Sequence, residues 1–135
     1  MPRVIDGDNL LGTWPGRSRG DADKSALALE VDVLRRTEKR RVILVFDGPP
    51  PAGVSHGSDV LFSGKGRKAD AVILEILSQE LDKSGWTVVT HDRSLADQCR
   101  SLGARVEAAR SFRERLLHDT VGENPDAPDH PKRPR

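Results

Sequence analysis

Four aspartates lie where the sequence pattern passes from one structural element to the next. Asp6, Asp47 and Asp92 each follow a short apolar segment typical of a strand, and Asp70 lies at the start of a helical pattern. The carboxyl ends of parallel strands open onto one crevice, where α/β proteins bind ligands. Carboxylates gathered there repel one another unless a cation lies between them, and Mg²⁺ and Mn²⁺ prefer oxygen ligands and bridge to phosphate. The pattern therefore predicts metal-dependent chemistry on phosphate groups.

Each of these aspartates also has a purely structural interpretation. Asp92 could cap the following helix, and Asp70 could interact favourably with the dipole of its own helix. Asp6 and Asp47 both precede a glycine and could simply form turns. For any one residue the structural interpretation is the more common one. Because all four fall on one predicted edge of a sheet, the metal-site hypothesis is favoured.

Basic residues flank the predicted acidic cluster. Lys65, Arg67 and Lys68 precede Asp70, and Arg93 follows Asp92. Such cations could bind backbone phosphates on either side of a scissile bond. The alternative is a solvated, charged loop without a ligand, and the sequence does not favour either interpretation.

The elements that must position these residues are predicted from hydrophobic periodicity. Apolar runs predict five strands, at residues 3–5, 42–46, 60–62, 86–89 and 105–106. Helical spacing predicts helices at residues 23–39, 68–81 and 93–102, and a final helix that begins at Ser111. Ser111 and Glu114 match a capping box, and Gly7 and Asn9 favour a sharp turn directly after the first strand.

Strands that alternate with helices predict an α/β fold with a central parallel sheet and right-handed crossovers. The expected strand order is 3-2-1-4-5. In that order the first and fourth strands meet at the topological switch point, so Asp6 and Asp92 would face each other across the crevice. Asp47 and Asp70 would complete the same cluster.

Composition indicates one domain. The chain has 135 residues, of which 32% are charged and 36% hydrophobic, and its net charge is only +1. Binding to nucleic acid would therefore depend on local patches of positive charge and not on the electrostatic field of the whole protein. We expect a single domain at residues 1–118 and a disordered, proline-rich charged tail at residues 119–135. Neither a membrane span nor a signal segment is recognisable, which favours a cytoplasmic protein.

Two further side chains that could react or bind a metal are interpreted as structural. Cys99 lies among apolar residues of a predicted helix and is expected to be a small buried hydrophobe. His91 has no partner at the spacing of a zinc site, so a surface position is expected, with a supporting role behind a metal ligand as the alternative.

Several motifs together resemble the NYN domains, which are relatives of the PIN nucleases, and the YacP-like branch in particular. The matching segments are Val4-Ile5-Asp6-Gly7-Asp8-Asn9, Val45-Phe46-Asp47-Gly48, Lys68-Ala69-Asp70-Ala71 and Thr90-His91-Asp92-Arg93. They occur in the same order and with similar spacing, and the resemblance covers residues 3 to 113.

The resemblance implies a three-layer α/β/α sandwich of the PIN type and a metal-dependent endoribonuclease that uses Mg²⁺ or Mn²⁺. Asp6, Asp70 and Asp92 take the principal acidic positions and would be the metal ligands, Asp47 would be an auxiliary acid, and Asn9 an orienting amide. Asp8 departs from the family, in which many members carry an aromatic residue there. It is either an outer-sphere metal ligand or a solvated turn residue, and the second interpretation is preferred.

The resemblance further implies that single-stranded RNA, in particular messenger RNA, is the substrate, with the ribosome as a candidate partner. We expect a monomer or a weak homodimer. One alternative is an adaptor that binds RNA or the ribosome without turnover. Another is a phosphatase of the haloacid-dehalogenase type with Asp6 as its nucleophile, although Leu10 stands where that motif usually carries threonine or valine.

Overall fold

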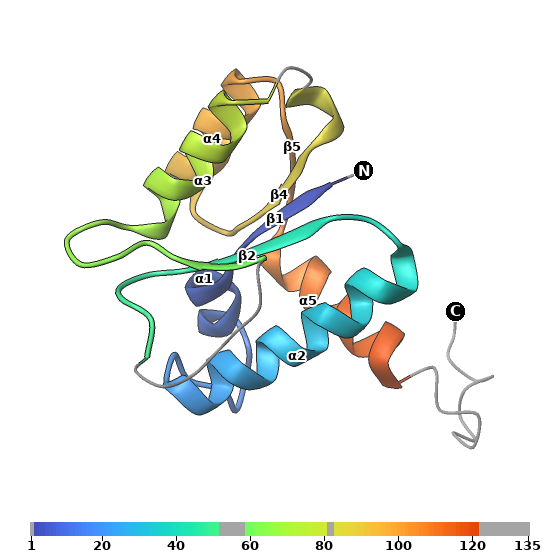
Figure 1. Cartoon of the computed structure of the whole chain (residues 1–135). Coiled ribbons are helices and arrows are strands. Elements are labelled where there is room, and N and C mark those ends of the chain that lie inside the picture. The colour runs from blue at the N-terminus through green and yellow to red at the C-terminus, as the bar shows by residue number, and fades with distance from the viewer. Residues whose placement is uncertain (1, 52–58, 81–82, 122–135) are drawn as a thin grey trace.

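The computed structural model describes residues 2–51, 59–80 and 83–121. They form a five-stranded, all-parallel sheet with the order β3-β2-β1-β4-β5 (Figure 1). The strands are β1 (Arg3–Asp6), β2 (Val42–Phe46), β3 (Val60–Phe62), β4 (Thr87–Val89) and β5 (Arg105–Glu107). The helices are α1 (Gly7–Gly12), α2 (Asp21–Glu38), α3 (Ala69–Ser78), α4 (Arg93–Ser101) and α5 (Ala109–Val121), with a 3₁₀ turn at Lys83–Gly85. The predicted fold class and strand order are confirmed.

Helices cover the sheet on both faces, which makes a three-layer α/β/α sandwich. Along β1, Val4 belongs to the core under α3 and α4, and Ile5 belongs to the core under α2 and α5. This alternation follows from the extended backbone, in which successive side chains point to opposite faces. Every residue of β1 and β2 is buried, as expected for the central strands of a parallel sheet. Figure 1 shows α3 and α4 on one side of the sheet and α1, α2 and α5 on the other.

The segment after β1 differs from the sequence-based expectation. A turn was expected there, but residues Gly7–Gly12 form helix α1. Leu10 and Leu11 are fully buried, and they anchor this short helix in the core beside α2 and α5. Gly7 permits the close approach of α1 to β2, because a Cβ atom at this position would lie 2.5 Å from the Phe46 ring. Six residues are too few for hydrophobic periodicity to distinguish a helix from a turn.

The start of the last helix was also predicted incorrectly. Helix α5 begins at Ala109 and not at Ser111, so the predicted capping box of Ser111 and Glu114 lies inside the helix and not at its start. The acceptor at the start of this helix comes from elsewhere in the chain, because Nδ1 of His91 accepts a hydrogen bond from the Ala109 N–H at 3.2 Å. His91 is exposed, as expected, yet it connects the end of β4 to α5.

The other elements lie close to their predicted positions. The helices predicted at 23–39, 68–81 and 93–102 differ from α2, α3 and α4 by at most three residues at either end. Helix α5 runs to Val121, and the remaining part of the predicted disordered tail, residues 122–135, lies outside the described residues. Cys99 is fully buried, as predicted, and burial raises the pKa of its thiol to about 11. None of the described helices is both long and apolar enough to span a membrane.

Candidate active site

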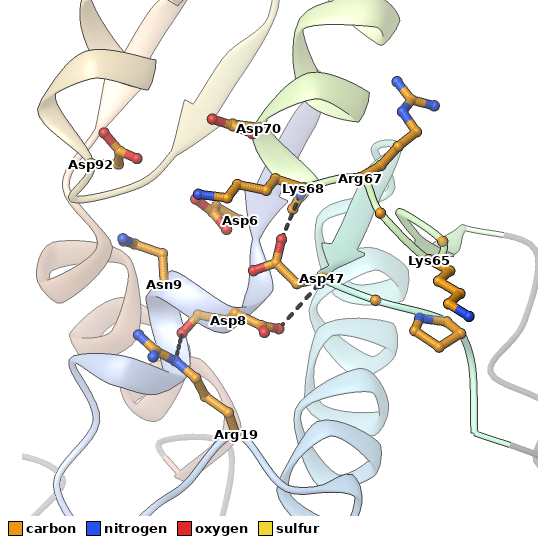
Figure 2. A pocket seen from close by; sticks show the side chains of 15 residues that line it. Asp6, Asp8, Asn9, Arg19, Asp47, Lys65, Arg67, Lys68, Asp70 and Asp92 are labelled. Atoms are coloured by element: carbon orange, nitrogen blue, oxygen red, sulfur yellow. Dashed lines mark hydrogen bonds between the residues drawn. The ribbon is translucent and has the colours of Figure 1, made fainter.

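A pocket of about 560 Å³ lies at the carboxyl edge of the sheet (Figure 2). Its wall contains all three predicted metal ligands, which come from the end of β1, the first turn of α3 and the residue before α4. The acidic and amide side chains that line it are Asp6, Asp8, Asn9, Asp47, Asp70 and Asp92. The basic ones are Arg19, Lys65, Arg67 and Lys68. We call it the acidic pocket. The sheet order thus brings together residues that are up to 86 positions apart in sequence, from Asp6 to Asp92.

Asp6 is the most enclosed carboxylate of the acidic pocket. It lies at the end of the central strand β1 and is only 7% exposed. Burial raises the pKa of its carboxyl group from 3.8 to about 6, and the neighbouring charges of Asp47 and Asp8 act in the same direction. A hydrogen bond from the Thr90 hydroxyl opposes this rise. In the absence of a cation, a large fraction of Asp6 is therefore protonated near pH 6.

Thr90 links two of the predicted metal ligands and was not identified from the sequence as a site residue. Its hydroxyl is buried, donates a hydrogen bond to Asp6 Oδ2 at 3.1 Å and accepts one from the Asp92 N–H at 3.0 Å. The end of β1 is thereby fixed relative to the start of α4. Thr90 belongs to one of the family motifs, but no sequence pattern indicates that its hydroxyl is directed at Asp6, 84 residues away.

Asp92 combines its predicted structural role with a place in the pocket wall. Its Oδ1 accepts a hydrogen bond from the Leu95 N–H at 3.2 Å and so caps α4. The same residue lines the acidic pocket. Its Oδ2 forms no hydrogen bond with any described residue. The capping interpretation is therefore correct, and it does not exclude a metal-binding role, because one oxygen atom is enough for each.

Asp47 positions the neighbouring acid, Asp70. Lys68, the residue before α3, provides no side-chain cap, and Oδ1 of Asp47 instead accepts a hydrogen bond from the Ala69 N–H at 2.6 Å. Gly48 then takes a φ of +88°, which turns the chain away from the end of β2. The Asp47 hydrogen bond holds Asp70 in the first turn of α3, where its side chain lines the pocket (Figure 2). Asp70 itself has no hydrogen bond or ion pair within the described residues.

Asn9 and Asp8 both belong to α1 and differ in their contacts. Oδ1 of Asn9 accepts a hydrogen bond from the His91 N–H at 2.6 Å and so orders the segment before Asp92. Oδ1 of Asp8 lies 3.8 Å from Lys24 Nζ and 3.4 Å from the Asp47 backbone nitrogen, which donates to it.

The preferred interpretation of Asp8 as a solvated turn residue is wrong. The residue is helical and its side chain is only 13% exposed. Burial raises the pKa of its carboxyl group, and the positive charge of Lys24 acts against that rise.

The predicted basic residues are only partly brought together. Lys65, Arg67 and Lys68 line the acidic pocket, and Figure 2 shows the Lys68 side chain extending into it. Arg67 is directed away and lies 3.2 Å from Glu75, with both side chains well exposed. Arg93 does not line the acidic pocket at all but a separate, smaller hollow. Its neighbour Asp92 faces the acidic pocket, because successive residues at a helix start point in different directions.

Arg19 is a basic residue that lines the acidic pocket and was not identified from the sequence as a site residue. It lies in the loop before α2, and its Nε donates a hydrogen bond to the Asp8 carbonyl at 2.9 Å. Gly12 makes room for it, because a Cβ atom there would lie 2.4 Å from Arg19 Nη2. No motif or periodicity distinguishes Arg19 from the other arginine of the same loop, Arg17, which pairs with Glu30.

The donor set fits a hydrated hard cation better than a closed metal site. Within the described part of the chain, no three histidine, cysteine, aspartate or glutamate side chains form a group that could hold a metal ion by themselves. Mg²⁺ usually takes only one or two carboxylates and completes its coordination with water and substrate phosphate. The carboxylates of the pocket supply such oxygen ligands, and the raised pKa of Asp6 indicates a position at which a cation would be favourable.

Comparisons with known proteins agree with this geometry. The family model described as the YacP-like NYN domain matches residues 3–131. A solved structure of Rae1 (YacP) from Bacillus subtilis, a W164L mutant, is 22% identical with a TM-score of 0.75 and covers 90% of this chain and 79% of its own. A second Rae1 (YacP) structure from the same organism is 20% identical with a TM-score of 0.73, over 98% of this chain and 83% of its own. At these identities the structural matches establish a shared fold. No curated protein matches the sequence.

Proposed function

The chain belongs to the YacP-like NYN domain family, and from this premise we propose that it is a metal-dependent endoribonuclease that hydrolyses phosphodiester bonds of RNA. The observation that carries the proposal is the acidic pocket, in which three acids from distant elements meet beside several basic side chains. A phosphodiester carries negative charge, so an acidic pocket binds it only together with a cation. The family's relation to PIN nucleases supplies the reaction class.

In this proposal Asp6, Asp70 and Asp92 hold one or two Mg²⁺ or Mn²⁺ ions, directly or through water. A bound divalent cation lowers the pKa of water and neutralises charge that develops on the scissile phosphate. Asp47 supports the site by fixing the start of α3, where Asp70 lies. Asn9 supports it by fixing the segment before Asp92. No side chain needs to act as a nucleophile.

The basic side chains position the substrate. Lys68 extends into the acidic pocket and has no ion-pair partner within the described residues, so its ammonium group is available to a phosphate oxygen. Lys65 and Arg67 lie on the same side, and Arg19 lies beside Asp8. The substrate in the proposal is single-stranded RNA, messenger RNA in particular, with the ribosome as a partner in the cytoplasm. By analogy with the family, cleavage leaves a 5′-phosphate and a 3′-hydroxyl.

The first prediction tests the acids. Asp6→Asn and Asp92→Asn should each reduce RNA cleavage at least about hundredfold, because the metal loses a charged ligand, a change equivalent to roughly 3 kcal/mol of transition-state stabilisation. Asparagine can still cap a helix, so Asp92→Asn should keep α4 intact. The assay is gel analysis of end-labelled RNA with Mg²⁺, Mn²⁺ or EDTA, with and without ribosomes. Asp21→Asn, an exposed acid at the start of α2, is the matched control.

Two outcomes would contradict the proposal. Normal cleavage by either variant would remove that aspartate from the site. RNA binding that persists in EDTA, with no cleavage under any metal condition, would favour the adaptor. Trapping an acyl-phosphate on Asp6 would favour the phosphatase, whose family is not the one that matches this chain.

A further inference from the structure

A second hollow, of about 210 Å³, lies on the other side of the segment that carries Asp92. Its lining residues are Thr90, His91, Arg93, Ala96, Arg100, Val106 and Ala108. They come from the end of β4, one face of α4 and the segment around β5. We call it the basic hollow. It shares a wall with the acidic pocket, since Thr90 and His91 line the hollow and Asp92, the next residue, lines the pocket.

The ionisable side chains that line the basic hollow are all basic. No aspartate or glutamate is among them, whereas the acidic pocket has five aspartates in its wall. Arg93 has no ion-pair partner within the described residues. Arg100 lies 3.5 Å from Asp97, but both side chains are more than half exposed, so this pair is weak. Both guanidinium groups can therefore bind an anion.

His91 adds a hydrogen-bond donor of fixed orientation. Its Nδ1 accepts a hydrogen bond from the Ala109 N–H, and its backbone N–H donates to Asn9 Oδ1. When Nδ1 accepts, the neutral imidazole carries its proton on Nε2, which makes that atom a donor. The residue is held from two sides, so little entropy is lost when an anion binds.

We infer that the basic hollow binds a backbone phosphate of the same RNA strand whose scissile phosphate lies in the acidic pocket. The inference rests on the proposed function and adds a binding site to it. A guanidinium group matches the oxygens of a phosphate in two parallel hydrogen bonds, and two such groups from α4 lie at the hollow. Lys65 and Lys68 bind the scissile phosphate in the acidic pocket, and Arg93 and Arg100 bind a phosphate farther along the strand.

This arrangement assigns Arg93 a role different from that of Lys65 and Lys68. A residue of the acidic pocket contacts the phosphate that reacts, so removing it changes both binding and turnover. Arg93 and Arg100 contact a phosphate that does not react, so removing them changes binding alone.

The test measures RNA affinity by fluorescence polarisation in EDTA, where no cleavage occurs, and cleavage kinetics separately with metal. The variants are Arg93→Gln, Arg100→Gln and the double substitution. Arg105→Gln is the matched control, because Arg105 is an exposed arginine at the start of β5 that does not line the hollow. The probes are a long single-stranded oligonucleotide and a dinucleotide that reaches only the acidic pocket.

The double variant should bind the long RNA about tenfold more weakly. The slope of log K against log salt should fall by about 0.7 for each phosphate that the variant no longer binds. KM should rise on the long RNA with kcat unchanged, and cleavage of the dinucleotide should not change. Restoring the charge with Arg93→Lys and Arg100→Lys should recover part of the affinity.

Three results would overturn the inference. One is an unchanged affinity and salt slope in the double variant, and another is an equal weakening of binding in Arg105→Gln. The third is a weakening seen only with RNA that carries a 5′-phosphate, which would make the hollow a site for a terminal phosphate. If the unmodified protein cleaves RNA in any of these cases, the proposed function still stands. If it neither binds nor cleaves RNA, both fall together.

Discussion

Two regions of the molecule hold buried or half-buried charges and arrange them in opposite ways. On the α2 and α5 face of the sheet, Arg3 lies 3.0 Å from Glu38 and 3.6 Å from Glu107, and Arg115 lies 3.2 Å from Glu107 and 4.0 Å from Glu38. Both arginines also lie over the Phe112 ring. We call these four charged residues the Arg3 network. Within it each charge has an opposite charge beside it.

The acidic pocket contains charges of both signs without pairing them. Asp8 forms an ion pair with Lys24, which does not line the pocket, but Asp6, Asp70 and Asp92 have no cation within ion-pair distance among the described residues. The consequence appears in the pKa of Asp6, which burial raises to about 6. In the Arg3 network the loss of one charge leaves its partner buried without compensation, whereas the buried Asp6 carboxylate already lacks a cation and favours the binding of one.

The largest expected stability change concerns the Arg3 network. Arg3→Met should lower the free energy of unfolding by about 3 kcal/mol, because it leaves Glu38 and Glu107 partly buried with less compensating charge. Urea denaturation monitored by circular dichroism measures the change. The remaining folded protein should cleave RNA normally, since Arg3 does not line the acidic pocket. A decrease below about 1 kcal/mol would show that the other cations near the two glutamates, Arg115 and Arg40, compensate them without Arg3.

A smaller change of opposite sign is expected in the acidic pocket. Asp6→Asn should raise the free energy of unfolding by about 1–3 kcal/mol near pH 7 without metal, because the folded protein no longer contains a buried carboxylate. The pKa of Asp6 is about 6 in the folded protein and 3.8 ordinarily, so its ionisation costs stability as pH rises from about 4 to 6.

The gain from this substitution should therefore be full above about pH 6 and absent below about pH 4. Denaturation at both pH values in EDTA measures the difference. A gain that does not depend on pH would mean that packing, not charge, is its cause. No gain at either pH would mean that Asp6 is already compensated in the apo protein, and the contrast with the Arg3 network would fail.

The smallest change in the free energy of unfolding is expected for an exposed ion pair. Comparing it with the buried Arg3 network separates the effect of burial from the effect of charge pairing. Arg36 lies 2.5 Å from Asp32 across one turn of α2, but Arg36 is 72% exposed. Arg36→Met should change the free energy of unfolding by less than about 0.5 kcal/mol, because water screens the pair. The measurement is the same denaturation experiment. A change as large as that of Arg3→Met would show that proximity of opposite charges matters here more than their burial.

The sequence by itself predicted the five strands, the four helices other than α1, the strand order and the edge of the sheet on which the acids meet. The apolar run of β2 and the periodic residues of α3 specify a central strand and a packed helix, since hydrophobic burial depends on a local pattern. Asp6, Asp47, Asp70 and Asp92 lie at the ends of such elements, so their convergence followed from the topology.

Only the tertiary structure decided which atoms contact one another within that site. The Thr90 hydroxyl meets Asp6 across 84 residues, the Asn9 side chain meets the His91 N–H across 82, and Asp47 meets the Ala69 N–H across 22. Arg19 lines the acidic pocket although no sequence pattern distinguishes it, and Arg93, which follows Asp92 in the sequence, lines the basic hollow instead of the acidic pocket. Hydrogen bonds are short and directional, so their partners depend on the packed positions of distant segments, which no local pattern encodes.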